Sequence, residues 1–169
     1  MPPTEKISEF HVDAMLCDSV VTADGKLFVQ GGGWTMLNVP ALPTQLPRLG
    51  VGLVITVPYL ATNQNHGLSI ELKSEDGEPV LVGASPNLTD PAGLGGIGEP
   101  VKAEGQFNVG RPPILLPGEA QSLPFAINID GLQFANAGGY VVVISVDGTP
   151  LRSLHFRVIA PAQQNLGVR

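Results

Sequence analysis

Few side chains in this chain have the types and spacing that could support chemistry. His11 and Asp13 stand two residues apart in an extended segment, so both would lie on one face of a strand and could offer two metal ligands. The other histidines, His66 and His155, are distant in sequence, and the chain has no His-x-His pair. A solvated strand face is the preferred interpretation, and we expect no metal ion and no other cofactor.

Nucleophilic catalysis finds no stronger support. Ser19, Ser69 and Ser153 lack the Gly-x-Ser-x-Gly context of a nucleophile elbow. The single cysteine, Cys17, lies inside a predicted strand without a basic or helix-terminal neighbourhood, which favours a buried, inert thiol. We therefore expect no catalytic residues.

Acidic turns allow a second metal interpretation. If every strand reverses direction, Glu75, Asp76 and Glu78 share one end of the molecule with Glu119 and Asp147, where carboxylates could cage calcium. Three Asp-Gly pairs, at 24–25, 76–77 and 147–148, are explained by turn chemistry alone. Turn formation is the preferred interpretation.

The segment Gly31-Gly32-Gly33-Trp34 interrupts a predicted strand. Three glycines could cradle an anion, but no Gly-Lys-Ser/Thr ending and no helix follow, so a bulge or a close backbone approach is favoured. The only tryptophan could stack on a ligand or pack on the core edge, and the second is more usual. The residues that we single out as candidate ligand or partner contacts are Trp34, Gly32, Gly33 and His66.

Alternation of apolar and polar residues with a period of two dominates the chain and is clearest from Leu68 to Lys73. No stretch has a strong 3.6-residue period. We therefore predict a single antiparallel β-sandwich, immunoglobulin-like or jelly-roll in type, of about eight or nine strands over residues 1–160, with a flexible tail over 161–169. The main predicted strands are 10–20, 27–30, 51–57, 68–73, 101–109, 123–129, 139–146 and 154–158.

Two connections stand out. The proline-rich stretch from Pro40 to Pro47 is predicted to be an extended crossover. The segment from Ala84 to Pro100 is the longest predicted loop, and long loops on compact scaffolds often carry function.

Two predicted strands, 51–57 and 140–146, are apolar on both faces, although a two-sheet sandwich normally buries one face of each strand. The cover for the second face is either the segment 35–47 or another subunit. We favour a homo-oligomer, most simply a dimer.

Composition excludes several partners. Hydrophobic residues make up 43% of the chain, charged residues 14%, and the formal net charge is −6, so neither nucleic acid nor an anionic membrane surface is expected as a partner. No apolar run approaches a membrane span, and the first residues do not resemble a signal peptide. We expect a cytoplasmic protein.

Several motifs carry a resemblance. Leu16-Cys17-Asp18-x-Val20, Gly25-Lys26-Leu27 and Gly31-Gly32-Gly33-Trp34 together resemble an uncharacterised bacterial family of small β-sandwich proteins. The hairpin that begins at Gly139-Tyr140 and ends in Leu154-x-Phe156-x-Val158 resembles the last two strands of immunoglobulin-like and fibronectin-like modules. The resemblance implies a fold and no activity.

Two functions remain. The first is a non-enzymatic interaction or assembly module that binds a protein partner through a sheet face or end loops. The alternative is a binder of small molecules or carbohydrates, with or without enzymatic activity, whose pocket lies near Trp34.

Overall fold

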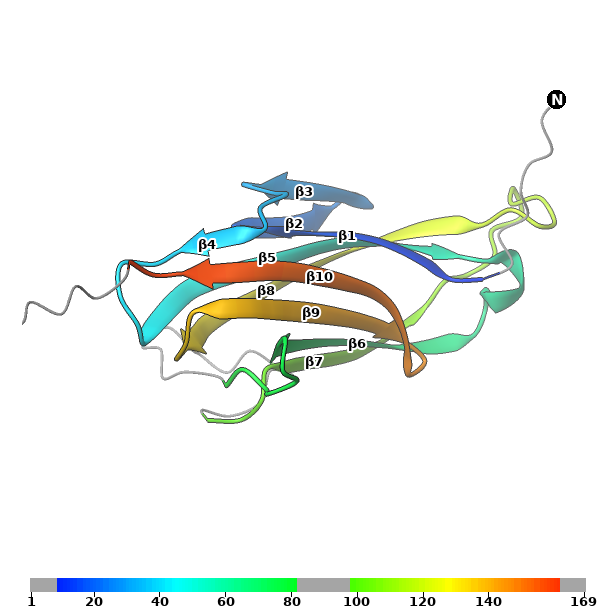
Figure 1. Ribbon diagram of the computed structural model, residues 1–169. Helices are drawn as coiled ribbons and strands as arrows, with labels where there is room; N and C mark the ends of the chain where they lie inside the picture. Colours follow the sequence, from blue (N-terminus) through cyan, green and yellow to red (C-terminus); the bar gives the residue numbers. More distant parts are fainter. Residues whose placement is uncertain (1–8, 82–97, 162–169) are drawn as a thin grey trace, which may run out of the picture.

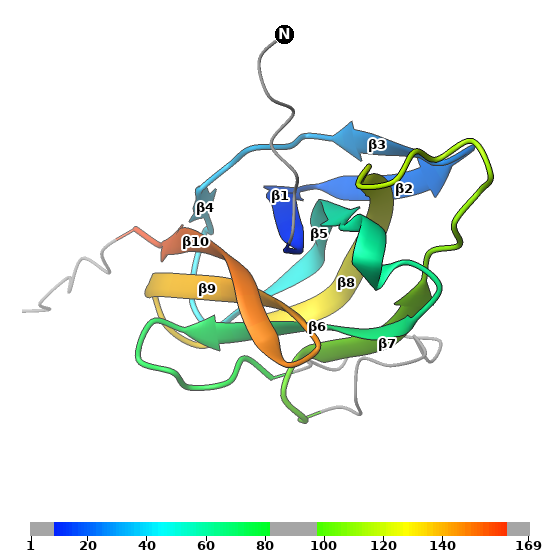
Figure 2. The same ribbon diagram turned by 90° about the vertical axis from the view of Figure 1, so that its right-hand side faces the viewer.

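The computed structural model describes residues 9–81 and 98–161, and these residues form an all-β fold, as predicted (Figure 1). Two sheets and a hairpin stack in three layers, which are seen best along the strands (Figure 2). One 3-10 turn, η1 (Tyr59–Ala61), joins two of the strands. The strands are β1 (His11–Cys17), β2 (Ser19–Ala23), β3 (Lys26–Gln30), β4 (Met36–Asn38), β5 (Thr44–Val57), β6 (Asn65–Ser74), β7 (Lys102–Asn108), β8 (Gln121–Phe134), β9 (Gly138–Val146) and β10 (Thr149–Ile159).

The core lies between a three-stranded sheet of order β1-β5-β8 and a five-stranded sheet of order β4-β10-β9-β6-β7. Neighbouring strands are antiparallel except β4, which runs parallel to β10. Alternate residues of each strand face inward and exclude water, which supplies most of the stabilisation. The fully buried residues include Val51, Leu53, Ile55, Ile70, Leu72, Val142 and Ile144.

The third layer is the hairpin β2–β3, which packs on the outer face of the three-stranded sheet (Figure 2). Its close approach depends on Gly52, because a Cβ there would stand 3.3 Å from side-chain atoms of Val20 and Leu27. Asn128 of β8 fixes the hairpin by accepting a hydrogen bond from the Val20 N–H (3.1 Å) and donating one to the Val20 carbonyl (2.8 Å). The hairpin therefore covers part of the second face of β5, which neither predicted cover anticipated.

Two predicted element boundaries are wrong. The single strand expected over 10–20 ends at Cys17, and the chain bends at Asp18 into the third layer. The crossover expected over 40–47 is partly strand, since β5 begins at Thr44 and pairs with β8 along its length. The ion pair between Arg48 and Asp130, with 2.6 Å between Nε and Oδ1, joins the two strands in this part.

Turns form at all three predicted Asp-Gly pairs, including the pair at 76–77, where Gly77 has a φ of 84°. Asp24 and Gly25 have φ values of 50° and 67°, and Asp147 and Gly148 have values of 50° and 78°, the left-handed backbone of a primed turn. The expected gathering of acidic turns at one end is wrong. Ser74 pairs with Tyr140 and Leu68 with Val146, so Glu75 and Asp147 lie at opposite ends of β9.

Two predictions lie outside the described residues. Most of the segment 84–100 and nearly all of the tail 161–169 belong to parts of the chain for which the structure gives no description.

Candidate functional site

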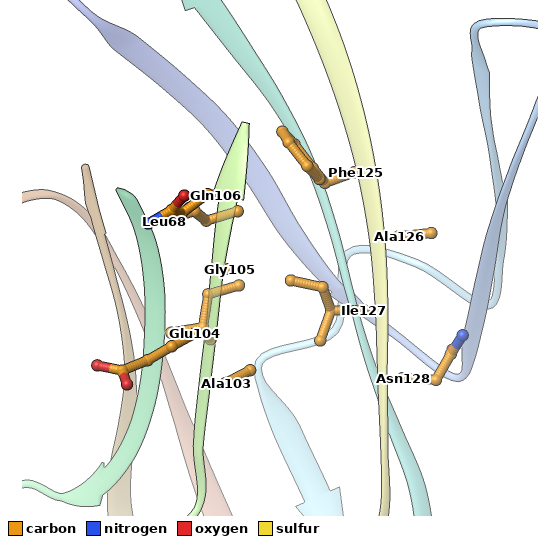
Figure 3. A pocket seen from close by; sticks show the side chains of 10 residues that line it. Leu68, Ala103, Glu104, Gly105, Gln106, Phe125, Ala126, Ile127 and Asn128 are labelled. Atoms are coloured by element: carbon orange, nitrogen blue, oxygen red, sulfur yellow. The ribbon is translucent and has the colours of Figure 1, made fainter. Parts of the chain in front are cut away.

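The interior of the sandwich is open along one side, between β7 and β8. Each of these strands is the last in its sheet, and a groove of about 310 Å³ lies between them. In Figure 3, Phe125 and Ile127 point from β8 toward β7, whereas Ala126 and Asn128 point the opposite way. Ala103 and Gly105 of β7 form the facing wall, and their small size leaves the space empty.

Incomplete burial of β8 shows that this side is open. The inward residues Leu123, Phe125 and Ile127 are only half-buried, although Leu53 and Ile55, beside them on β5, are fully buried. A Cβ built on Gly105 meets no atom within 4 Å. Apolar side chains that face a core yet reach solvent favour a further binding event that would cover them.

Among the residues that the structure describes, no strand pairs with the outer edge of β7, so this free edge offers unpaired backbone groups. The carbonyl groups of Val101 and Val109 accept hydrogen bonds from Leu72 and Asn63, so the odd-numbered backbone groups face β6. Because direction alternates along a strand, the N–H and C=O groups of Lys102, Glu104, Gln106 and Asn108 face the free edge. An edge of this kind can accept another strand.

Charged side chains line the outer rim of β7. Lys102 lies 2.6 Å from Glu104 and 3.6 Å from Glu71, and Glu71 lies 2.7 Å from Lys73. The hydrogen bond from Lys73 lowers the pKa of Glu71, and the hydrogen bond to Glu104 raises the pKa of Lys102. Glu71 and Lys102 therefore stay ionised at neutral pH, and the four side chains form a row of acidic and basic groups beside the groove.

Trp34 packs at the core edge. Its ring meets Phe156 edge-on at 5.7 Å between centroids, and its Nε1 is buried without a hydrogen-bond partner among the described residues. Gly32 lies against Met15 and Val29 so closely that a Cβ would collide with both. These contacts agree with a close backbone approach.

Gly33 has a φ of 88°, and its N–H donates to the Leu16 carbonyl (2.8 Å). A backbone amide already used in this way is not free to bind an anion.

The thiol of Cys17 is fully buried, and burial raises its pKa, which makes the nucleophilic thiolate harder to form.

His66 lies far from Trp34, at the end of the sandwich that carries η1 and the β9–β10 turn. Its Nδ1 is 2.8 Å from Asp147 Oδ2 and its Nε2 is 2.8 Å from the Ala61 carbonyl. Both oxygens only accept hydrogen bonds, so both nitrogens are satisfied only in the doubly protonated imidazolium. Phe10 and Phe107 enclose the ring, at 4.8 and 5.4 Å between centroids.

The pKa values of this pair follow from its contacts. Burial lowers the pKa of His66, but the hydrogen bonds to Asp147 and to the Ala61 carbonyl outweigh burial and raise it. The hydrogen bonds from His66 and from the Gly67 N–H lower the pKa of Asp147. The pair joins β6, η1 and the β9–β10 turn, so the structure gives His66 a structural role.

The four residues singled out from the sequence do not form one site, because Gly32, Gly33 and Trp34 are consecutive whereas His66 lies at the other end of the sandwich, and sequence reasoning missed the groove. The signal was present in the predicted strand 101–109, where the inward positions 103 and 105 are alanine and glycine rather than large residues. Small residues at core-facing positions leave a space that neighbouring strands must fill or leave open.

Across residues 9–81 and 98–161, no group of three or more His, Cys, Asp or Glu side chains is placed to hold a metal ion. In the same residues there is no helix with the length and apolar character needed to cross a membrane.

Comparison with known proteins gives a family but no activity. Residues 12–159, far more than half of the chain, match the model of a family described as a family of unknown function, DUF6941. This match agrees with the predicted resemblance to an uncharacterised family. A search of curated proteins finds no match.

Proposed function

The chain belongs to the DUF6941 family, and we propose that it is a non-enzymatic protein-binding module whose partner adds a β-strand along the free edge of β7. The observation that carries the proposal is the open side of the sandwich. There an edge whose backbone groups have no partner strand within residues 9–81 and 98–161 borders an apolar groove that the fold leaves partly exposed.

An added strand would make two kinds of contact. Its backbone would bond to the outward N–H and C=O groups of Lys102, Glu104 and Gln106 and extend the five-stranded sheet. Its alternate side chains would enter the groove and cover Phe125 and Ile127. The proposed specificity is therefore for an extended segment with apolar residues at every second position.

The alternative function, a ligand pocket at Trp34, has less support, because that ring packs on Phe156 and its nitrogen is buried.

We further propose a cytoplasmic location in a bacterial cell. The single buried thiol of Cys17 supports a reducing compartment, since the fold does not depend on a disulfide.

Peptide selection tests the proposal directly. A display library of random peptides, each about ten residues long, is selected on protein immobilised at low density, and enriched peptides are labelled to measure Kd. We expect enriched sequences to alternate apolar and polar residues. Sequences without alternation, or no enriched peptide at all, would overturn the proposal.

Variants locate the binding edge. Gln106→Pro removes one outward N–H while leaving the bonds to β6, so peptide affinity should fall roughly tenfold or more. Gln106→Thr keeps the N–H and is the matched control. Gly105→Val should also weaken binding, because the open space at Gly105 lets a side chain fill the groove from within. Equal affinities for the wild-type protein and both blocking variants would contradict strand addition at β7.

A further inference from the structure

We propose that the strand added at β7 is the same edge of a second copy of this chain, residues 98–108, paired antiparallel about a two-fold axis at Ala103. The two β7 strands then lie opposite each other from Lys102 to Glu104, and residues 105–108 lie opposite residues 98–101 of the other copy. The inference rests on the proposed function, because it uses the same edge and groove. The partner is a second copy, and the charges of Lys102 and Glu104 on the outer rim of β7 fix how the two copies align.

The backbone limits the possible alignments. Only even-numbered residues of β7 direct their N–H and C=O groups outward, so hydrogen-bonded pairs between copies must join even residues. A two-fold axis can then pass through Ala103, Glu104 or Gly105. An axis at Glu104 would place that carboxylate directly opposite its own copy, and like charges in this position destabilise a sheet.

Charge complementarity selects the axis at Ala103. With that axis, Lys102 of each copy lies opposite Glu104 of the other, which gives two opposite-charge pairs across the junction. Lys102 already lies beside Glu71 on β6, so a row of Glu71, Lys102 and Glu104 of the second copy alternates in charge. An axis at Gly105 would instead set Glu104 opposite Gln106 and gain no charge pair.

The groove supplies the apolar part of the interface. A two-fold axis that joins the β7 edges turns the open sides of the two copies toward each other. The half-buried Phe125 and Ile127 of each copy would then line one shared interior instead of a solvent-exposed slot. Burial of such side chains is the main source of stability in association.

Charge-swap variants test both the partner and the alignment. Lys102→Glu places two carboxylates opposite each other, and Glu104→Lys places two ammonium groups opposite each other, so each variant alone should dimerise roughly tenfold or more weakly than the wild type. A mixture of the two should form a heterodimer at wild-type strength, because both junction pairs again have opposite charges. The measurement is solution mass by light scattering after size-exclusion chromatography over a range of concentrations.

Each outcome has a defined meaning. Dimers of the wild type and of the mixture, with weaker self-association of each variant, support the proposal. A wild type that stays monomeric at every concentration overturns it, and so do single variants that dimerise as strongly as the wild type. In those cases peptide selection still tests strand addition, so the proposal of a second copy as the partner can be wrong while the proposed function stands. A peptide affinity of Gln106→Pro equal to that of the wild type would overturn the proposed function itself.

Discussion

The two ends of the sandwich contain similar aromatic clusters that are stabilised in different ways. At one end, Phe134, Tyr140 and Phe156 pack together with Trp34, with ring centroids 4.9 to 6.1 Å apart. At the other end, Phe10 and Phe107 surround His66, whose ring is hydrogen-bonded to Asp147 and has a raised pKa. The first end depends on burial and on one neutral hydrogen bond, from the Tyr140 hydroxyl to the Asn136 carbonyl (2.7 Å), whereas the second also depends on a proton.

This difference separates two demands on a β-sandwich. The Trp34 end closes the core, where close packing of large rings excludes water. At the His66 end, η1 and the β9–β10 turn have few buried residues of their own. The pair of His66 and Asp147, here called the clamp, fixes both turns with two short hydrogen bonds, one to Asp147 and one to the Ala61 carbonyl. Removing packing should therefore cost more than removing the clamp.

Phe134→Ala should give the largest effect. The side chain is fully buried and contacts both Tyr140 and Phe156, so its loss should lower the free energy of unfolding by about 3–5 kcal/mol. Urea denaturation measures the change. Phe125→Ala is the matched control, because that ring is half-buried in the open groove and should cost less. Equal losses would mean that the groove is as closed as the Trp34 end.

Asp147→Asn should give the next largest effect. Asparagine tolerates the left-handed φ of 50° at this turn, so the change removes the charge rather than the backbone geometry. The imidazolium of His66 then loses its counter-ion, at a cost of about 1–2 kcal/mol, because Asp147 is half-exposed and solvent screens the pair.

The chain offers a matched control for that variant. His11 and Asp13 form a similar pair, 3.2 Å apart, but with side chains that are 61% and 74% exposed. Asp13→Asn should change stability by less than about 0.5 kcal/mol. Comparable losses in the two variants, measured by urea denaturation, would contradict the structural role of the buried clamp.

Local patterns were sufficient to predict the strands but not how they assemble. The alternation from Leu68 to Lys73 and the Asp-Gly turns depend on neighbouring residues, and the structure confirms both. The bend at Asp18 and the third layer depend on contacts of the hairpin with Gly52 and Asn128, which follow far along the chain. The periodicity of apolar residues within one segment does not indicate which distant segments pack together.

The candidate site was harder to predict for the same reason. The partners of His66 are Ala61, Phe107 and Asp147, which lie elsewhere in the sequence, so the sequence around His66 gave no sign of these contacts. The groove exists because two strands that are neighbours in sequence become edges of different sheets. Only the alanine and glycine at inward positions of β7 hinted at that open space.

A pH series should show a smaller effect that is confined to the His66 end. Because the folded pKa of His66 is raised, its stabilisation is complete below the unfolded value of about 6.5 and is lost as pH rises through the folded value. Asp147, with a lowered pKa, contributes above about 3.9 and loses its contribution as pH falls through its folded value.

The expected result is a wild-type melting temperature that falls between about pH 6 and pH 9 more than that of Asp147→Asn, in which the clamp is already weakened. Nuclear magnetic resonance titration of the His66 ring gives the pKa directly, and Asp147→Asn should lower it. Parallel melting curves for the two proteins would contradict a proton-dependent clamp.

Apart from the control Asp13→Asn, Trp34→Phe should give the smallest effect, and it sharpens the comparison most. Phenylalanine keeps an aromatic ring against Phe156 and removes the Nε1–H, which is buried without a partner among the described residues. The lost packing area and the removed unpaired donor act in opposite directions, so the free energy of unfolding should change by less than about 1 kcal/mol. In the wild type, indole emission should be typical of a buried ring and should not respond to glucose, galactose or other simple sugars. A loss above about 2 kcal/mol, or a sugar-dependent shift in emission, would mean that the Nε1–H has a partner or that the ring meets a ligand. The Trp34 ring would then contribute through a polar atom as well as through packing, and the contrast between packing at one end and charge at the other would weaken.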